Sequence, residues 1–164
     1  SRGNLAGAYG DAGELALAAD MFEQTLVDSQ RVLGPNHPHT LTSRNNLAST
    51  CLAMGRFDRA IDLFEQNLAE SQILLGPDHP HAIASRGNLA AAHRDAGRLD
   101  EAIDLYERTL ADCERVLGPT HPQTELFRNR LAAAYWAAER PEDARALLGP
   151  LPDIDGTGAD RTGD

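Results

Sequence analysis

The sequence has few cysteines, few aromatic residues, fewer basic than acidic side chains, and no long apolar run. Two cysteines in 164 residues cannot form a disulfide framework, so we expect a reducing, cytoplasmic compartment. The 25 acidic and 15 basic residues give a net charge of −10, which argues against nucleic acid as a partner and fits a partner with some basic character. No segment approaches the roughly 18 apolar residues of a membrane span, and no signal peptide is visible.

Motifs for catalysis and metal binding are also missing. No Ser-His-Asp order, phosphate-binding glycine loop or nucleotide fingerprint occurs, and we expect Cys51 and Cys113 to be unreactive, with Cys51 a small buried hydrophobe. The His-x-His pairs that begin at His37 and His79 resemble metal ligands. However, His37, His79 and His121 each precede a proline and lie 42 residues apart. This regularity favours a hydrogen bond at a helix start. We therefore expect neither an enzyme nor a cofactor or metal site.

What the sequence does contain is a repeat of 42 residues. The stretch 33–48 returns at 75–90 and again from Leu117. Its Gly-Pro pairs begin at Gly34, Gly76 and Gly118, and residues 34–75 share 21 of 42 identities with 76–117, without a gap. A fixed period of this length indicates stacked copies of one supersecondary unit. Residues 42 positions apart are called equivalent below.

Each unit predicts two helices, an A helix and then a B helix. Pro38 suits the first turn of an A helix because its missing N–H would be unpaired there, and Gly55 ends that helix. Gly76 followed by Pro77 ends the B helix. The expected helices cover the start of the chain to Ala12 and on to Leu33, then 38–54 and 57–75, 80–96 and 99–117, 122–138, and a short segment after Pro141.

The fold class that follows is all-α, a solenoid of antiparallel helix pairs. We expect an array over 1–149 with units at about 1–33, 34–75, 76–117 and 118–149, and a disordered tail or linker over 150–164. Ser1 is equivalent to Ser43 and Ser85, inside a helix. We therefore expect the chain to be a piece of a longer protein.

The helix pairs resemble tetratricopeptide repeats. The residues that carry the resemblance are Leu47, Ala48, Gly55, Ala60, Phe64 and Leu68, with Leu89, Ala90, Gly97, Ala102, Tyr106 and Leu110 in the next unit; the last unit has Glu139 at the glycine position, which leaves its turn open. The longer period and the LGPxHP linker resemble the kinesin-light-chain-type repeats found in bacterial proteins. This resemblance implies a right-handed superhelix whose concave wall of A helices holds a peptide or protein segment, as a sensor or adaptor region of a larger bacterial protein.

By the same resemblance, one face of each A helix lines this concave groove. The expected groove residues are Asn4, Asn45, Asn46, Ser49, Asn88, Arg94, Asn129, Arg130 and Trp136. A ladder of amides can pair with the backbone of an extended peptide. The alternative is that the asparagines cap or brace neighbouring helices. A clamp for a C-terminal carboxylate is not expected, because Gly3 and Gly7 occupy two of its positions.

A second ladder consists of Arg2, Arg44, Arg86 and Arg128. We expect these side chains to pack their stems on the repeat and to pair with B-helix carboxylates, with Glu65 and Glu107 as candidates. Contact with a ligand is the alternative.

A second function is open besides peptide binding. Each repeat contacts only its neighbours, so the two ends of an array expose surfaces that inner repeats cover. The chain could therefore form homo-oligomers through its repeat ends.

Overall fold

The computed structural model describes residues 14–149, whose regular structure is entirely helical. The helices are α2 (Leu15–Leu33), α3 (Pro38–Ala53), α4 (Phe57–Leu75), α5 (Pro80–Asp95), α6 (Leu99–Val116), α7 (Pro122–Ala137) and α8 (Pro141–Leu148). The A helices are α3, α5 and α7, and the B helices are α2, α4, α6 and α8. Their bounds lie within one residue of those predicted. The expected A helix of the first unit and the expected tail lie outside the described residues.

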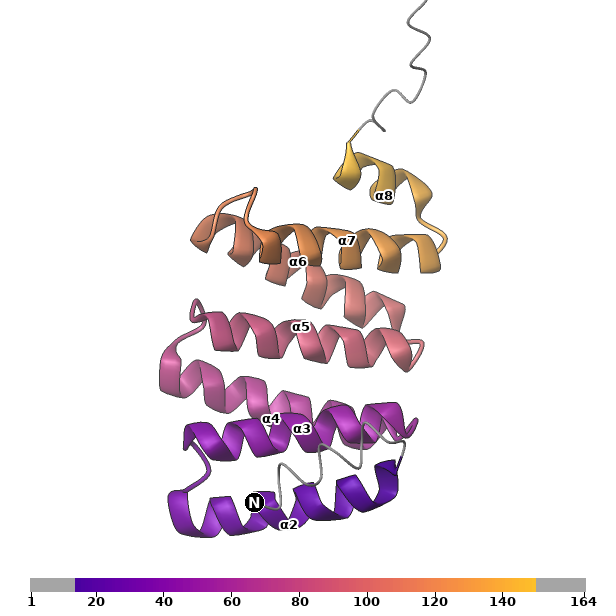
Figure 1. Cartoon of the computed structure of the whole chain (residues 1–164). Coiled ribbons are helices and arrows are strands. Elements are labelled where there is room, and N and C mark those ends of the chain that lie inside the picture. The colour runs from indigo at the N-terminus through magenta and orange to yellow at the C-terminus, as the bar shows by residue number, and fades with distance from the viewer. Residues whose placement is uncertain (1–13, 150–164) are drawn as a thin grey trace, which may run out of the picture.

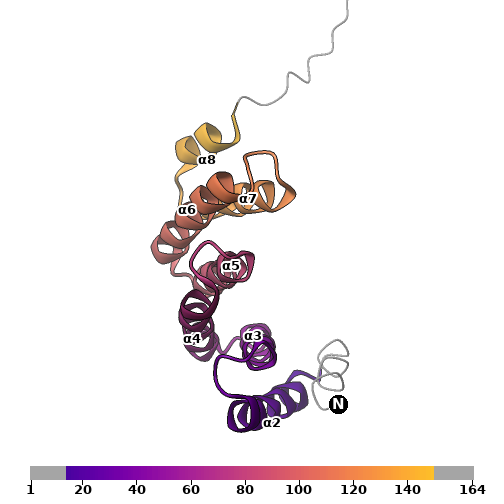
Figure 2. The same cartoon turned by 90° about the vertical axis from the view of Figure 1, so that its left-hand side faces the viewer.

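The helices form a stack in which each packs on its neighbours in sequence and runs in the opposite direction (Figure 1). Seen from the side, the stack is a curved double layer, with the A helices on the inner side and the B helices on the outer side (Figure 2). This arrangement confirms the predicted all-α solenoid. It also confirms that the A helices line the concave face.

The linkers between units repeat one set of contacts. At the first linker, Gly34 has φ of 91°, a value that favours glycine, and Nδ1 of His37 accepts a hydrogen bond from the backbone N–H of His39 at 3.1 Å. His79 and His121 cap α5 and α7 with the same bond, also at 3.1 Å. The bond satisfies an N–H that has no partner within the helix. The predicted role of these histidines at helix starts is therefore confirmed.

The turn from A to B helix is kept in all three described pairs. Gly55 and Gly97 have φ of 71° and 76°, and Glu139 takes the same left-handed conformation with φ of 57°. The backbone N–H of Arg140 donates to the Tyr135 carbonyl at 2.9 Å, as at the other two turns. A side chain in this conformation costs roughly 1–2 kcal/mol, so Glu139 preserves the turn under local strain.

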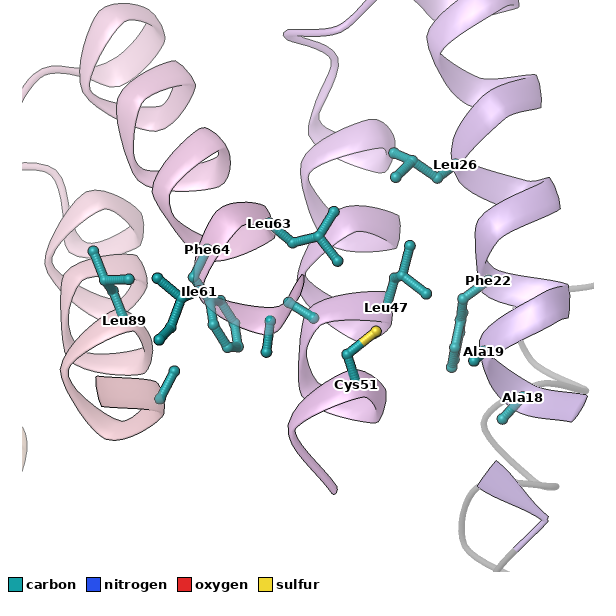
Figure 3. Close-up of a cluster of buried hydrophobic side chains, with 13 residues drawn as sticks. Ala18, Ala19, Phe22, Leu26, Leu47, Cys51, Ile61, Leu63, Phe64 and Leu89 are labelled. Carbon is teal, nitrogen blue, oxygen red and sulfur yellow. The ribbon is translucent and has the colours of Figure 1, made fainter. Parts of the chain in front are cut away.

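The core consists of two clusters of buried side chains that run between successive helices. In the first, Phe22 of α2 faces Leu47 of α3, and Ile61 of α4 lies beside Leu89 of α5 (Figure 3). Both cysteines are buried and unpaired, and burial raises the pKa of both thiols. The prediction that Cys51 is a small buried side chain is therefore confirmed.

Candidate functional site

The A helices α3, α5 and α7 lie on the inner side of the stack (Figure 2), and several of their polar residues are accessible. Of the predicted groove residues, Asn4 lies outside the described residues. Exposed ones are Ser49, Asn129 and Trp136, and half-buried ones are Asn45, Asn46, Asn88, Arg94 and Arg130.

Two of the asparagines bond to each other. Nδ2 of Asn88 on α5 donates to Oδ1 of Asn45 on α3 at 3.0 Å, so this amide pair ties two consecutive A helices together. The bracing role is therefore the observed one for this pair, although each amide keeps further hydrogen-bonding capacity. In contrast, the side chain of Asn46 makes no hydrogen bond to any residue of 14–149.

The two arginines of the predicted site differ in their partners. Nε and Nη2 of Arg94 both donate to Oδ1 of Asp95, at 2.9 and 2.7 Å. The guanidinium of Arg130 lies 5.6 Å from the centre of the Phe127 ring, in cation–π contact. Within residues 14–149, Arg130 has no carboxylate partner. It is a half-buried cation on the A helix α7.

Trp136 contacts the last B helix. The guanidinium of Arg145 on α8 lies 5.5 Å from the centre of its indole ring, and the indole remains exposed. Trp136 thus lies at the end of the stack, where α7 packs against α8. Its contact with a bound peptide stays a prediction.

The arginine ladder is structural. Arg44 is 1% exposed and pairs through Nη1 with Glu70 of α4, and Arg86 pairs in the same way with Asp112 of α6. The predicted pairing with B-helix carboxylates is confirmed, but the candidate partners were wrong. Glu107 instead accepts a hydrogen bond from the Tyr135 hydroxyl at 2.5 Å, and Glu65 is exposed.

The last member of the ladder uses a different helix. Nη2 of Arg128 on α7 donates to Glu114 of α6 at 2.9 Å and to the Pro119 carbonyl at 3.1 Å. The residue equivalent to Glu70 and Asp112 would be Ile154, beyond the short α8. Arg128 therefore pairs with the preceding B helix rather than with its own. Arg2 lies outside the described residues.

These contacts shift the pKa of several side chains. Partial burial raises the pKa of Asp112, but hydrogen bonds from Arg86 and Arg115 outweigh it and hold that pKa below its usual range. Burial and the bond to Glu107 raise the pKa of Tyr135 to about 12. These groups keep one charge state near neutral pH and act as fixed structural contacts.

Sequence reasoning missed two buried polar groups. His93 is 8% exposed, and its Nδ1 has no hydrogen-bond partner within the described chain. Tyr106 is fully buried, and its hydroxyl is likewise unpartnered there. The signal for His93 was present in the repeat, because its equivalents are the core residues Cys51 and Tyr135.

Charge is divided between the two layers. The three A helices hold five arginines and two carboxylates, whereas the four B helices hold fifteen carboxylates and five arginines. The A helices thus carry an excess of arginine and the B helices an excess of carboxylates, and Arg44, Arg86 and Arg128 join the two layers by ion pairs.

Other kinds of site find no support in the part of the chain that the structure describes. Within residues 14–149, no three metal-ligating side chains come together. No helix in the same range is both long and apolar enough to cross a membrane. The chemistry on offer at the inner face is hydrogen bonding and charge pairing.

Comparison with known proteins identifies the family. The profile described as "Tetratricopeptide repeat" matches residues 1–69, 45–111 and 81–149. The chain belongs to the tetratricopeptide-repeat family. Proteins of this family generally mediate protein–protein interactions and are generally non-catalytic. A search of curated proteins found no match.

Solved structures show the same repeat array. A P. anserina protein assigned as a kinesin light chain, with nearly identical TPR-like repeats, is 31% identical, with a TM-score of 0.81 over 90% of this chain and 70% of the other. BtubC from P. vanneervenii is 24% identical, with a TM-score of 0.81 over 92% and 65% of the two chains; it shows the fold alone. The tetratricopeptide repeats of this chain are therefore of the kinesin-light-chain-like kind.

Proposed function

We propose that this tetratricopeptide-repeat chain is a non-catalytic recognition module that binds a segment of another protein along its concave face. The proposal rests on the contacts that Arg130 makes and lacks. Each of Arg44, Arg86 and Arg128 pairs with a B-helix carboxylate, whereas Arg130 on the A helix α7 has none among the described residues. An accessible guanidinium that is held over a ring and lacks an anion is suited to bidentate capture of a carboxylate.

The amides on the same layer complete the proposed site. Asn46, Ser49 and Asn129 are accessible, and no described residue accepts from or donates to the side chain of Asn46. They can pair with the backbone of an extended segment. The partner is therefore proposed to be an extended protein segment with at least one acidic side chain, which Arg130 receives. Within a larger protein, the array would serve as a sensor or adaptor region.

The test is selection from a displayed library of random peptides, followed by affinity measurement on purified variants. The site variant combines Asn46→Ala, Ser49→Ala and Arg130→Ala. The control combines Gln30→Ala, Arg31→Ala and Gln66→Ala, which removes similar groups from exposed positions of α2 and α4. We expect acidic peptides to be enriched, and their affinity to fall at least about tenfold in the site variant only.

Two results would contradict the proposal. Selected peptides that bind both variants equally would exclude the concave face as the binding surface. Enrichment of basic peptides that bind the site variant unchanged and are weakened by added salt would move recognition to the acidic outer layer.

A further inference from the structure

A cavity of about 490 Å³ lies between α4 and α6, which are successive helices of the outer layer (Figure 2). This volume falls within the range of pockets that bind small molecules. The side chains that give the cavity its chemistry are Leu68 and Gln72 of α4, Leu105, Arg108 and Asp112 of α6, and Arg86 of α5.

The leucines of this cavity are more accessible than their equivalents one unit earlier. Leu26 and Leu63 are 7% and 2% exposed and belong to the first core cluster. Their equivalents Leu68 and Leu105 pack against the same cluster but are only half-buried. An apolar wall is therefore accessible between α4 and α6, whereas its counterpart between α2 and α4 is covered.

The buried arginine of the cavity is also less completely covered than its equivalent. Arg86 pairs with Asp112 and is 8% exposed, whereas Arg44 pairs with Glu70 and is 1% exposed. Asp112 is equivalent to Glu70 and one methylene shorter, so it shields less of the guanidinium to which it is bonded. The cavity thus contains a cation that is more than nine-tenths buried and still partly accessible.

The polar groups of the cavity have spare donors rather than spare acceptors. Oδ2 of Asp112 accepts from Arg86, and Oδ1 accepts from Arg115 at 2.9 Å, so both oxygens are engaged. Within residues 14–149, Nη1 is the only guanidinium atom of Arg86 that has a hydrogen-bond partner. Arg108 pairs with Asp104 on its own helix, and both of these side chains are more than half exposed. Such a surface pair is weak, so Arg108 can exchange its partner.

We infer that the cavity between α4 and α6 binds a small aliphatic carboxylate, with its chain against Leu68 and Leu105 and its carboxylate on Arg108. The ionised side chains of the cavity are two arginines and one aspartate, so an anion is favoured over a cation. Guanidinium and carboxylate form strong, bidentate hydrogen bonds, and burial of the aliphatic chain adds a hydrophobic contribution. The amide of Gln72 supplies a further donor. This site is independent of the peptide site proposed for the A helices.

The first experiment titrates the 164-residue chain with hexanoate and follows the methyl and amide signals by NMR. Hexanamide and hexylammonium are the matched probes, because they keep an aliphatic chain of the same kind and change the polar end. We expect hexanoate to bind saturably with a dissociation constant below about 5 mM and to shift the signals of Leu68, Gln72 and Leu105. Each of the other two probes should bind at least about tenfold more weakly.

The site variant combines Arg108→Gln with Asp112→Glu. These substitutions supply the residues of the preceding unit, Gln66 and Glu70, so the variant should fold like the parent. It loses the rim guanidinium and gains a carboxylate that covers Arg86 more fully. We therefore expect its affinity for hexanoate to fall at least about tenfold.

The control variant combines Arg31→Gln with Asp62→Glu. It makes the same two kinds of change, with the same net charge, at exposed positions of α2 and α4 outside the cavity. It should bind hexanoate like the parent. Arg130→Ala should also leave hexanoate binding unchanged, which separates this site from the proposed peptide site.

Four results would overturn the inference. They are a response to hexanoate that is weaker or does not saturate, equal binding of hexanoate and hexanamide, tighter binding of hexylammonium, and unchanged affinity in the site variant. If circular dichroism shows that the site variant is unfolded, the comparison of the three probes on the parent decides by itself.

Discussion

His93 is a titratable side chain at a position of the fold that other units fill with Cys51 or Tyr135. Burial lowers its pKa below the ordinary value of 6.5; Glu101 and Glu65 oppose this shift, and Arg98 adds to it. The neutral ring is therefore the form that the folded protein accommodates. The unfolded chain takes up the proton first as the pH falls, so acid favours unfolding at this residue.

We therefore predict that the free energy of unfolding decreases in acid because of His93. Stability that depends on neutral His93 is fully present above pH 6.5 and is lost as the pH falls through the lower folded pKa. Denaturant unfolding of the parent at about pH 7.5 and about pH 5.5 should show this loss, and His93→Phe should reduce it. The difference between parent and variant isolates His93 from the five other histidines. Equal pH dependence in both proteins would contradict the assignment.

Gly87 is the residue that admits the Phe127 ring between α5 and α7. A Cβ at this position would lie 2.2 Å from Cε1 of Phe127, and the ring is buried. We predict that Gly87→Ala lowers the free energy of unfolding by about 1–2 kcal/mol, since overpacking outweighs the gain in helix propensity. Urea unfolding measures this loss. In a Phe127→Leu background the same change should cost much less, and an equal cost in both backgrounds would exclude the ring as its cause.

At the scale of helices, local residue chemistry made the bounds predictable. Pro38 and its equivalents mark the helix starts, and Gly55 and its equivalents mark the ends, so the predicted and observed bounds agree within one residue. The facing partners were harder to predict. Arg44 is the seventh residue of α3, and antiparallel packing brings it level with Glu70, the sixth from the end of α4. The period shows which residues are equivalent, but it does not show which turns of two helices meet.

The ion pair between Arg44 and Glu70 gives the prediction at this scale. Arg44 is nearly inaccessible, and Glu70 is its only carboxylate partner among the described residues. Glu70→Ala leaves a buried, uncompensated guanidinium, so we expect a loss of about 2–3 kcal/mol in unfolding free energy, somewhat less than for a fully buried pair because Glu70 is partly accessible. Calorimetry or denaturant unfolding measures it. Adding Arg44→Met should restore most of the loss, and no recovery would mean that Glu70 acts through another contact.

At the scale of the whole molecule, the net charge does not show how charge is divided between the two layers. A total of −10 fits a basic partner, but the carboxylates are concentrated on the B helices and the A helices carry an excess of arginine. Composition averages over both layers, and only the fold separates them. The 42-residue repeat predicts the candidate site as a set of equivalent A-helix positions, just as it predicts the fold. Which members are free, such as Arg130, depends on contacts between helices that no repeat pattern specifies.

The stack should also open unevenly from its ends. Stability in a repeat array comes from contacts between neighbours, and α8 has eight residues, of which only Ala144 is buried. Amide hydrogen exchange at low protein concentration should therefore be fastest in α8 and slowest in α4, α5 and α6, whose faces are covered on both sides. Protection of α8 equal to that of α5 would contradict a stability that declines toward this end.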